Sequence, residues 1–184
     1  MKGREILIGV TGGIAAYKTA VLVSHLVQAG AGVSVVMTRS ATRLVGPKTF
    51  EALTGRKVRT RVFGRGAHPH IELAQAADLL CVAPATANLL AKAAHGLADD
   101  LLSTLLLSFD GPVLMAPAMN TVMWQKPAVQ RNAEQLRADG VVLLEPEEGR
   151  LSCGQTGPGR MAEPETIFQA IAEKLNGLKG RDVC

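Results

Sequence analysis

The chain has 184 residues, 47% of them hydrophobic but only 3% aromatic, and a net charge of +4. This length and composition suit one domain with a sizeable core of Ala, Val, Leu and Ile, and they exclude a disordered chain. Nucleic acid is not an expected partner, because the sequence has no continuous run of Lys and Arg and too few aromatic residues for base stacking; an anionic small molecule suits the mild positive charge equally well.

Short apolar runs alternate with helical patterns along the chain. The predicted strands are residues 5–10, 32–37, 57–63, 77–83, 112–115 and 141–144. The predicted helices are a stretch that ends at Gly30, then 40–54 with a break at Pro47, 86–95, 99–108, 127–139 and 164–175. This alternation predicts an α/β fold: an open, mostly parallel sheet with helices on both faces. Ligands of such sheets bind beyond the carboxyl ends of the strands.

Glycines and hydroxyl side chains follow the first two predicted strands. Gly12 and Gly13 lie between a strand and a helix start, where backbone N–H groups can hold a phosphate. Thr38 and Ser40 follow the second strand and could hold the same anion. Each feature also has a simpler interpretation, a tight turn for the glycines and helix capping for the hydroxyls.

Amide and hydroxyl side chains follow two later strands. Thr86 and Asn88 come after Pro84, and Asn120 ends the segment APAMN. These side chains could cap the next helices or hydrogen-bond a ligand, because an asparagine offers both a donor and an acceptor.

A histidine and a cysteine lie in polar or glycine-rich segments. His70 follows a polar loop, with His68 as a rival, and a lone histidine is usually structural. No metal site is expected, because no third ligand is near in sequence. Cys153 lies in the Gly- and Pro-rich segment 145–160, predicted to be a functional or mobile loop, which favours a reactive thiol on a flap. Cys81, in an apolar strand, is interpreted as structural.

Three cysteines without a CxxC pair indicate a reducing compartment. The first residues enter a strand without a signal-peptide pattern, and no apolar run is long enough to span a bilayer. We therefore expect a cytoplasmic location and no membrane partner.

Five segments together resemble one protein family. They are GVTGGIAAYK, TRSA, HIELAQAADLLCVAPATANLLAKAAHGLADDLLST, APAMNTVMW and SCGQTGPGRMAEPETI, in the family's order over residues 5–175. The chain resembles the homo-oligomeric flavin-containing cysteine decarboxylases. The resemblance implies a single Rossmann-like flavoprotein domain over residues 1–177 and FMN as the cofactor. Residues 178–184 would be a residual tail or the start of a synthetase domain, as in bifunctional members.

The resemblance also implies site residues. The FMN phosphate would lie on Gly12, Gly13 and Ile14, near Thr38 and Ser40. The isoalloxazine would be lined by Pro84, Ala85, Thr86, Asn88 and Met119. The catalytic residues would be His70, Asn120 as the holder of the substrate carboxylate, and Cys153 as the flap thiol. Some members carry arginines where this chain has Ala74 and Gln75, which leaves Arg160 as a candidate for the substrate phosphate.

The implied reaction is decarboxylation of 4′-phosphopantothenoylcysteine to 4′-phosphopantetheine in coenzyme A biosynthesis. The thiol is oxidised to a thioaldehyde, CO2 leaves to give an enethiol, and reduced flavin returns the electrons. Members form trimers with active sites at subunit interfaces, and some trimers pack into dodecamers.

The alternative reaction is oxidative decarboxylation of a peptide's C-terminal cysteine, which stops at the enethiol. A cysteine-bearing flap favours the full cycle of decarboxylation and reduction. Two non-enzymatic alternatives are a phosphatase-inhibiting flavoprotein, which would carry an acidic tail, and a nucleotide-binding module, which would need neither His70 nor Cys153.

Overall fold

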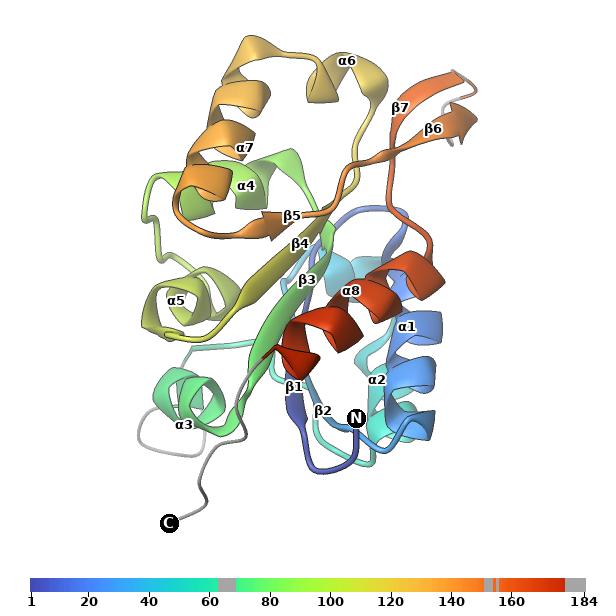
Figure 1. Ribbon diagram of the computed structural model, residues 1–184, viewed down its shortest axis with the longest axis vertical. Helices are drawn as coiled ribbons and strands as arrows, with labels where there is room; N and C mark the ends of the chain where they lie inside the picture. The colour runs from blue at the N-terminus through green and yellow to red at the C-terminus, as the bar shows by residue number, and fades with distance from the viewer. Residues whose placement is uncertain (63–68, 151–153, 155, 178–184) are drawn as a thin grey trace.

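A parallel sheet forms the centre of the computed structural model, which describes residues 1–62, 69–150, 154 and 156–177 (Figure 1). In the described part of the chain this sheet has five strands in the order β2-β1-β3-β4-β5. The strands are β1 (Glu5–Val10), β2 (Gly32–Met37), β3 (Leu79–Ala85), β4 (Val113–Pro117) and β5 (Val142–Leu143). Every neighbouring pair in this sheet is parallel.

The strand order changes direction between β1 and β3. The chain runs from β1 outward to β2, then crosses back and adds β3 and β4 on the other side of β1. The connections on the two sides of β1 therefore diverge, which leaves a crevice at the carboxyl ends of β1 and β3. Open α/β sheets bind their ligands at such a switch point.

Helices cover both faces of the sheet, and each face has its own apolar core. On one face lie α1 (Ala16–Gln28), α2 (Pro47–Thr54) and α8 (Pro164–Asn176). On the other lie α3 (Pro69–Ala76), α4 (Ala87–Ala94), α5 (Leu101–Ser108) and α7 (Pro127–Ala138). Ile6 and Ile8 of β1 enter the first core and Leu7 enters the second. Because the strands are buried on both faces, they appear in the sequence as continuous apolar runs.

Three short elements complete the fold: the 3-10 helix η1 (Ala41–Arg43), α6 (Thr121–Trp124) and an antiparallel hairpin of β6 (Glu147–Arg150) and β7 (Thr156–Arg160). Figure 1 shows α6 and the hairpin together at the upper end of the molecule and α3 at the lower end. None of the described helices is long and apolar enough to cross a lipid bilayer.

The predicted strand at residues 57–63 is wrong over its described part, residues 57–62. Only Arg59 makes a single bridge there, to Val36 of β2. The side chains of Lys57, Arg59 and Arg61 are exposed, and a strand with so many charged residues cannot be buried on both faces of a parallel sheet.

Three other predictions need correction. Residues 145–160 were expected to form a loop but contain the β6–β7 hairpin, whose glycine-rich strands carry no alternating pattern. His70 was expected to follow a polar loop, with no helix predicted around it, but it belongs to helix α3. The strand expected to end before Pro84 runs to Ala85, with a register shift between Val82 and Ala85 and a cis peptide bond at Ala83–Pro84.

Candidate functional site

The loops that follow β1 and β3 are joined by the hydroxyl of Thr11. Its Oγ1 donates a hydrogen bond to the carbonyl of Pro84 at 2.6 Å and accepts one from the backbone N–H of Thr86 at 3.2 Å. Thr19 of α1 donates a second hydroxyl hydrogen bond to the carbonyl of Ala83 at 2.7 Å. These bonds hold the two loops at the switch point in one arrangement.

The loops that follow β1 and β2 touch at a glycine. A Cβ built on Gly12 would lie 2.4 Å from the Cβ of Ser40, too close for any side chain. A Cβ on the next residue, Gly13, would lie 3.2 Å from Cγ of Pro84. Glycines therefore let three strand-end loops approach one another around a backbone-lined space.

Two cavities open side by side at this edge of the sheet. The larger is about 700 Å³ and the smaller about 460 Å³, within the usual size range of ligand sites. They share four lining residues: Gly12, Thr86, Ala87 and Met123. A single extended ligand can therefore occupy both cavities.

Most of the residues expected to form the site line these cavities. In the larger one they are Gly12, Gly13, Ile14, Thr86, Met119 and Asn120. In the smaller one they are Gly12, Thr38, Ser40, Thr86 and Asn88. Pro84 and Ala85 lie behind this surface; Pro84 packs against Gly13, and Ala85 is fully buried.

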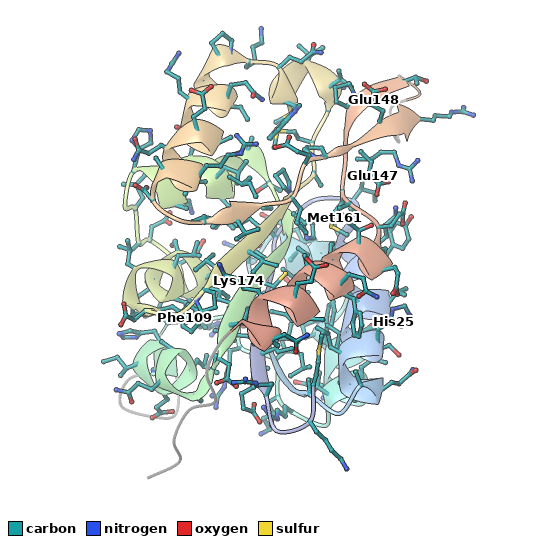
Figure 2. All side chains as sticks on the ribbon, in the orientation of Figure 1. His25, Phe109, Glu147, Glu148, Met161 and Lys174 are labelled. Carbon is teal, nitrogen blue, oxygen red and sulfur yellow. The ribbon has the colours of Figure 1, made fainter. Side chains whose placement is uncertain are left out.

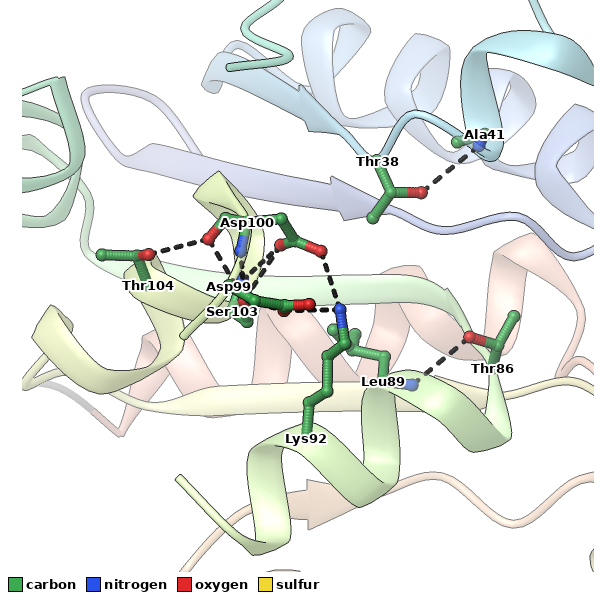
Figure 3. Close-up of polar contacts among 9 residues, drawn as sticks. All are labelled: Thr38, Ala41, Thr86, Leu89, Lys92, Asp99, Asp100, Ser103 and Thr104. Atoms are coloured by element: carbon green, nitrogen blue, oxygen red, sulfur yellow. Dashed lines mark hydrogen bonds and ion pairs between the residues drawn. The ribbon is translucent and has the colours of Figure 1, made fainter. Parts of the chain in front are cut away.

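Two of these lining side chains, Asn120 and Thr86, also cap helices, and Thr38 binds the first residue of η1. Asn120 accepts a hydrogen bond through Oδ1 from the N–H of Val122 at 2.8 Å. The hydroxyls of Thr86 and Thr38 accept from the N–H groups of Leu89 and Ala41, at 3.4 and 3.3 Å (Figure 3). The capping interpretation is therefore confirmed for Asn120 and Thr86, and capping also fixes these side chains at the cavity wall. At η1 the N-cap residue is Ser40, whose side chain makes no capping hydrogen bond.

A partly buried lysine, Lys92, forms part of the smaller cavity. Nζ of Lys92 on α4 lies 2.6 Å from a carboxylate oxygen of Asp99 and 3.2 Å from one of Asp100, and Figure 3 shows these contacts. The hydrogen bond that Lys92 donates to Asp99 is the main reason that the pKa of Lys92 is raised. Asp100 in turn accepts from the N–H of Ser103 at 2.9 Å and caps the N-terminus of α5. Lys92 thus stays protonated and joins α4 to the start of α5.

The hairpin lies against the loop that carries Asn120. The N–H of Met119 donates a 3.0 Å hydrogen bond to the carbonyl of Gly159 in β7. A Cβ on Gly157 would lie 2.8 Å from Oγ1 of Thr121, so β7 needs glycines to approach this loop. The hairpin therefore forms one wall of the larger cavity, through Arg150, Gly159 and Arg160.

His70 does not meet Asn120 within one chain. It lies on α3, which Figure 1 shows at the opposite end of the molecule from α6 and the hairpin. Neither cavity has His70 among its described lining residues. Cys153, the rival His68 and Cys184 lie outside the described residues.

The model of the Flavoprotein family matches residues 1–176. The chain belongs to the Flavoprotein family.

This flavoprotein has curated relatives at about half sequence identity. It is 51% identical over 178 residues to "Coenzyme A biosynthesis bifunctional protein CoaBC" of Bacillus subtilis, and 49% identical over 180 residues to the CoaBC protein of Mycolicibacterium smegmatis. Each match covers 95% of this chain and 43% of the relative. The chain therefore spans less than half the length of these relatives.

Solved structures share the fold of this flavoprotein. A PPC decarboxylase mutant complexed with pantothenoylaminoethenethiol superposes with a TM-score of 0.85 at 31% identity, over 96% of this chain and all of that one. The FMN-dependent cysteine decarboxylase SpaF gives a TM-score of 0.82 at 38% identity, over 94% of this chain and 98% of that one.

Apart from Arg160, none of the charged residues that line the two cavities was predicted from the sequence as a site residue. The missed residues are Lys18, Arg39, Lys92, Asp100 and Arg150. Lys18 and Lys92 lie on helices, several residues beyond the strand ends, where no local motif marks them. Among the described residues, no group of three or more His, Cys, Asp or Glu side chains could hold a metal ion.

Proposed function

We propose that this flavoprotein catalyses the FMN-dependent decarboxylation of 4′-phosphopantothenoylcysteine to 4′-phosphopantetheine, a step of coenzyme A biosynthesis. One observation carries the proposal: the backbone loop at Gly12–Ile14 and the amide of Asn120 line one cavity. The cavity therefore offers a phosphate-type loop and a polar group that can orient a carboxylate. The similarity to CoaBC proteins and to a PPC decarboxylase supports this choice of substrate.

FMN suits the two connected cavities. Gly12 and Gly13 leave backbone exposed where any side chain would collide with Ser40 or crowd Pro84, and the first turn of α1 begins beside them. A phosphate is stabilised at such a helix N-terminus, with Thr38 and Ser40 nearby. Thr86, Asn88 and Met119 would line the ring, in front of Pro84 and Ala85. Bound FMN would supply the two-electron oxidation and reduction that side chains do not perform.

Side chains of this protein would place the substrate and move its protons. Asn120 would hold the carboxylate so that the breaking C–C bond lies in line with the forming π system. His70 would accept a proton from the thiol or from Cα. Cys153 would return a proton to the enethiol and complete the saturated product. The alternative substrate, a peptide with a C-terminal cysteine, would need the first two groups only.

A second copy of the chain would supply His70. The larger cavity opens beside exposed apolar side chains: Ile14, Tyr17 and Val21 are 62%, 60% and 45% exposed. Tyr17 and Val21 lie one turn apart on the same face of α1. We propose that this face packs against a neighbour in a trimer, and that trimers can pack into dodecamers. In the trimer, α3 of the neighbour would bring its His70 to Asn120. Because the CoaBC relatives are bifunctional, we also propose that a synthetase domain or a partner synthetase works together with this chain.

Mixed oligomers test the shared site. His70→Asn and Asn120→Ala chains should each be inactive alone. Co-expressed in equal amounts, they should regain about a quarter of wild-type activity, because about a quarter of the sites then combine two intact residues from different chains. Absence of any recovery in verified mixed oligomers would show that both residues act from one chain.

Product analysis tests the reaction itself. Purified protein is incubated with 4′-phosphopantothenoylcysteine, products are followed by mass spectrometry, and the visible spectrum is recorded. A yellow protein that forms 4′-phosphopantetheine agrees with the proposal. Formation of the enethiol alone, or action on cysteine-ended peptides only, would favour the peptide enzyme. A colourless and inactive protein that FMN cannot restore would reject catalysis.

A further inference from the structure

A carboxylate links two cations at the wall of the larger cavity. Oε1 of Glu163 accepts hydrogen bonds from Nζ of Lys18 and from Nη2 of Arg160, both at 2.6 Å. Lys18 and Arg160 line the cavity, whereas Glu163 is not among its described lining residues. The side chain of Lys18 is only 17% exposed, so this ammonium group is held largely out of bulk solvent.

The charge of this group is unbalanced. Lys18, Arg150 and Arg160 line the cavity, and its described lining includes no Asp or Glu. Glu163 and the neighbouring Glu147, whose carboxylate accepts from the Glu163 N–H, bring two negative charges against these three positive charges. The hydrogen bond from Lys18 is the first cause that keeps the pKa of Glu163 below its ordinary value, so the carboxylate remains charged. A cavity with an excess of fixed positive charge attracts an anionic group.

Arg160 is held in place from two sides. A Cβ built on Gly149 would lie 2.6 Å from Nη1 of Arg160, so the guanidinium rests against the bare backbone of β6. Its Nη2 is bound by Glu163, whose own N–H donates to the carboxylate of Glu147 at 3.0 Å (Glu147 is labelled in Figure 2). A guanidinium fixed in this way loses little side-chain freedom when it binds a phosphate.

The cation group is connected to Asn120 through the backbone. Met119 and Gly159 are hydrogen-bonded, Asn120 follows Met119, and Arg160 follows Gly159. One cavity thus holds an amide suited to a carboxylate and cations suited to a second anion. The proposed substrate carries a carboxylate at one end and a phosphate monoester at the other.

We infer that Lys18 and Arg160, positioned by Glu163, bind the phosphate monoester of the substrate and so select phosphorylated over unphosphorylated cysteine conjugates. The inference rests on the proposed function and assigns the specificity of that site to these two cations.

The test compares two substrates, 4′-phosphopantothenoylcysteine and pantothenoylcysteine, with FMN-loaded wild type, Lys18→Met and Arg160→Met. Each variant should lower kcat/KM for the phosphorylated substrate about 10- to 100-fold, mainly through KM, because a charge-assisted hydrogen bond to phosphate is lost. The loss with pantothenoylcysteine should be several times smaller. The matched control is Lys48→Met, whose lysine is 93% exposed and forms an ion pair with Glu51; it should keep the wild-type preference.

Three results would overturn the inference. An equal loss of kcat/KM with both substrates would show that the two cations support the site without recognising the phosphate. Loss of flavin from the variants, measured as the ratio of visible to ultraviolet absorbance, would assign the cations to the cofactor's phosphate. Failure of the proposed function is distinguishable, because the wild type would then turn over neither substrate. A wild type that uses both equally well would refute the inference alone.

Discussion

Gly159 leaves no room for a side chain against Met119: a Cβ at Gly159 would lie 2.3 Å from the carbonyl oxygen of Met119. The residue also has a φ of +143°, which disfavours other amino acids. Through this contact, β7 of the hairpin lies directly on the loop that presents Asn120. The same glycine therefore sets both the hairpin position and the wall of the larger cavity.

Gly159→Ala should separate the hairpin from this loop. We expect it to destabilise the protein by about 2 kcal/mol more than Gly140→Ala does, because Gly140 has a positive φ but open space around it. Thermal unfolding of both variants measures the difference. Equal melting temperatures would show that the loop yields to the added methyl group and that the contact is not restrictive.

Gly12→Ala should weaken FMN binding. The added Cβ would lie 2.4 Å from Cβ of Ser40, so the loop after β1 must move away from the proposed phosphate position. Overpacking of about 1–3 kcal/mol corresponds to a Kd for FMN about 5- to 150-fold higher. Titration of apoprotein by flavin fluorescence measures the Kd. Gly46→Ala is the control, since nothing lies within 4 Å of its added Cβ; an unchanged Kd for Gly12→Ala would place the phosphate elsewhere.

Cys81 should resist thiol reagents in the folded protein. Complete burial raises the pKa of its thiol to about 12. At pH 8 its thiolate fraction is then about a thousandfold below that of an ordinary cysteine. In a Cys153→Ser, Cys184→Ser background, a disulfide reagent should react only after denaturant is added. Rapid reaction of the native protein would show that β3 opens locally.

The pair between Lys18 and Glu163 should make stability depend on pH. The pKa of Glu163 is lowered in the folded state, so its stabilisation is present above its ordinary pKa of 4.5 and is lost as pH falls through the folded value. Glu163 is 41% exposed, so we expect no more than about 1 kcal/mol. The wild type should melt above Glu163→Gln at pH 6, and this advantage should shrink below pH 4.5.

A double-variant control isolates that effect. In a Lys18→Met, Arg160→Met background, Glu163→Gln should change the melting temperature less, because the partners that lower its pKa are gone. An equal change in both backgrounds would assign the stabilisation to other contacts of Glu163.

Cys153→Ser should stop the proposed reaction at the enethiol, since a serine hydroxyl is a much weaker acid than a thiol. Mass spectrometry of the reaction mixture would show a product two mass units lighter than 4′-phosphopantetheine. Cys184→Ser, which changes the other cysteine outside the described residues, should give the saturated product. Complete reduction by Cys153→Ser would reject the role of this thiol.

Local signals were sufficient for most of the fold. The apolar runs at residues 5–10 and 32–37 match β1 and β2 because strands buried on both faces need a continuous apolar sequence. The segment at 57–62 failed for the opposite reason: its charged side chains need solvent, and only Arg59 bridges to the sheet. The hairpin at residues 147–160 could not be found by alternation, because Gly149, Gly157 and Gly159 are selected by contacts with distant residues.

The sequence by itself determined the alternating α/β order and the glycine, hydroxyl and amide residues at the strand ends, because these depend on neighbours within a few positions. Only the tertiary structure decided which strand ends meet. It also decided that Lys18 and Arg160 both donate hydrogen bonds to Oε1 of Glu163, although Lys18 and Glu163 are 145 residues apart. It also placed α3, which carries His70, at the opposite end of the chain's fold from α6, which Asn120 caps (Figure 1). The physical reason is that strand order and helix packing set distances in space, and neither leaves a periodic trace in the sequence.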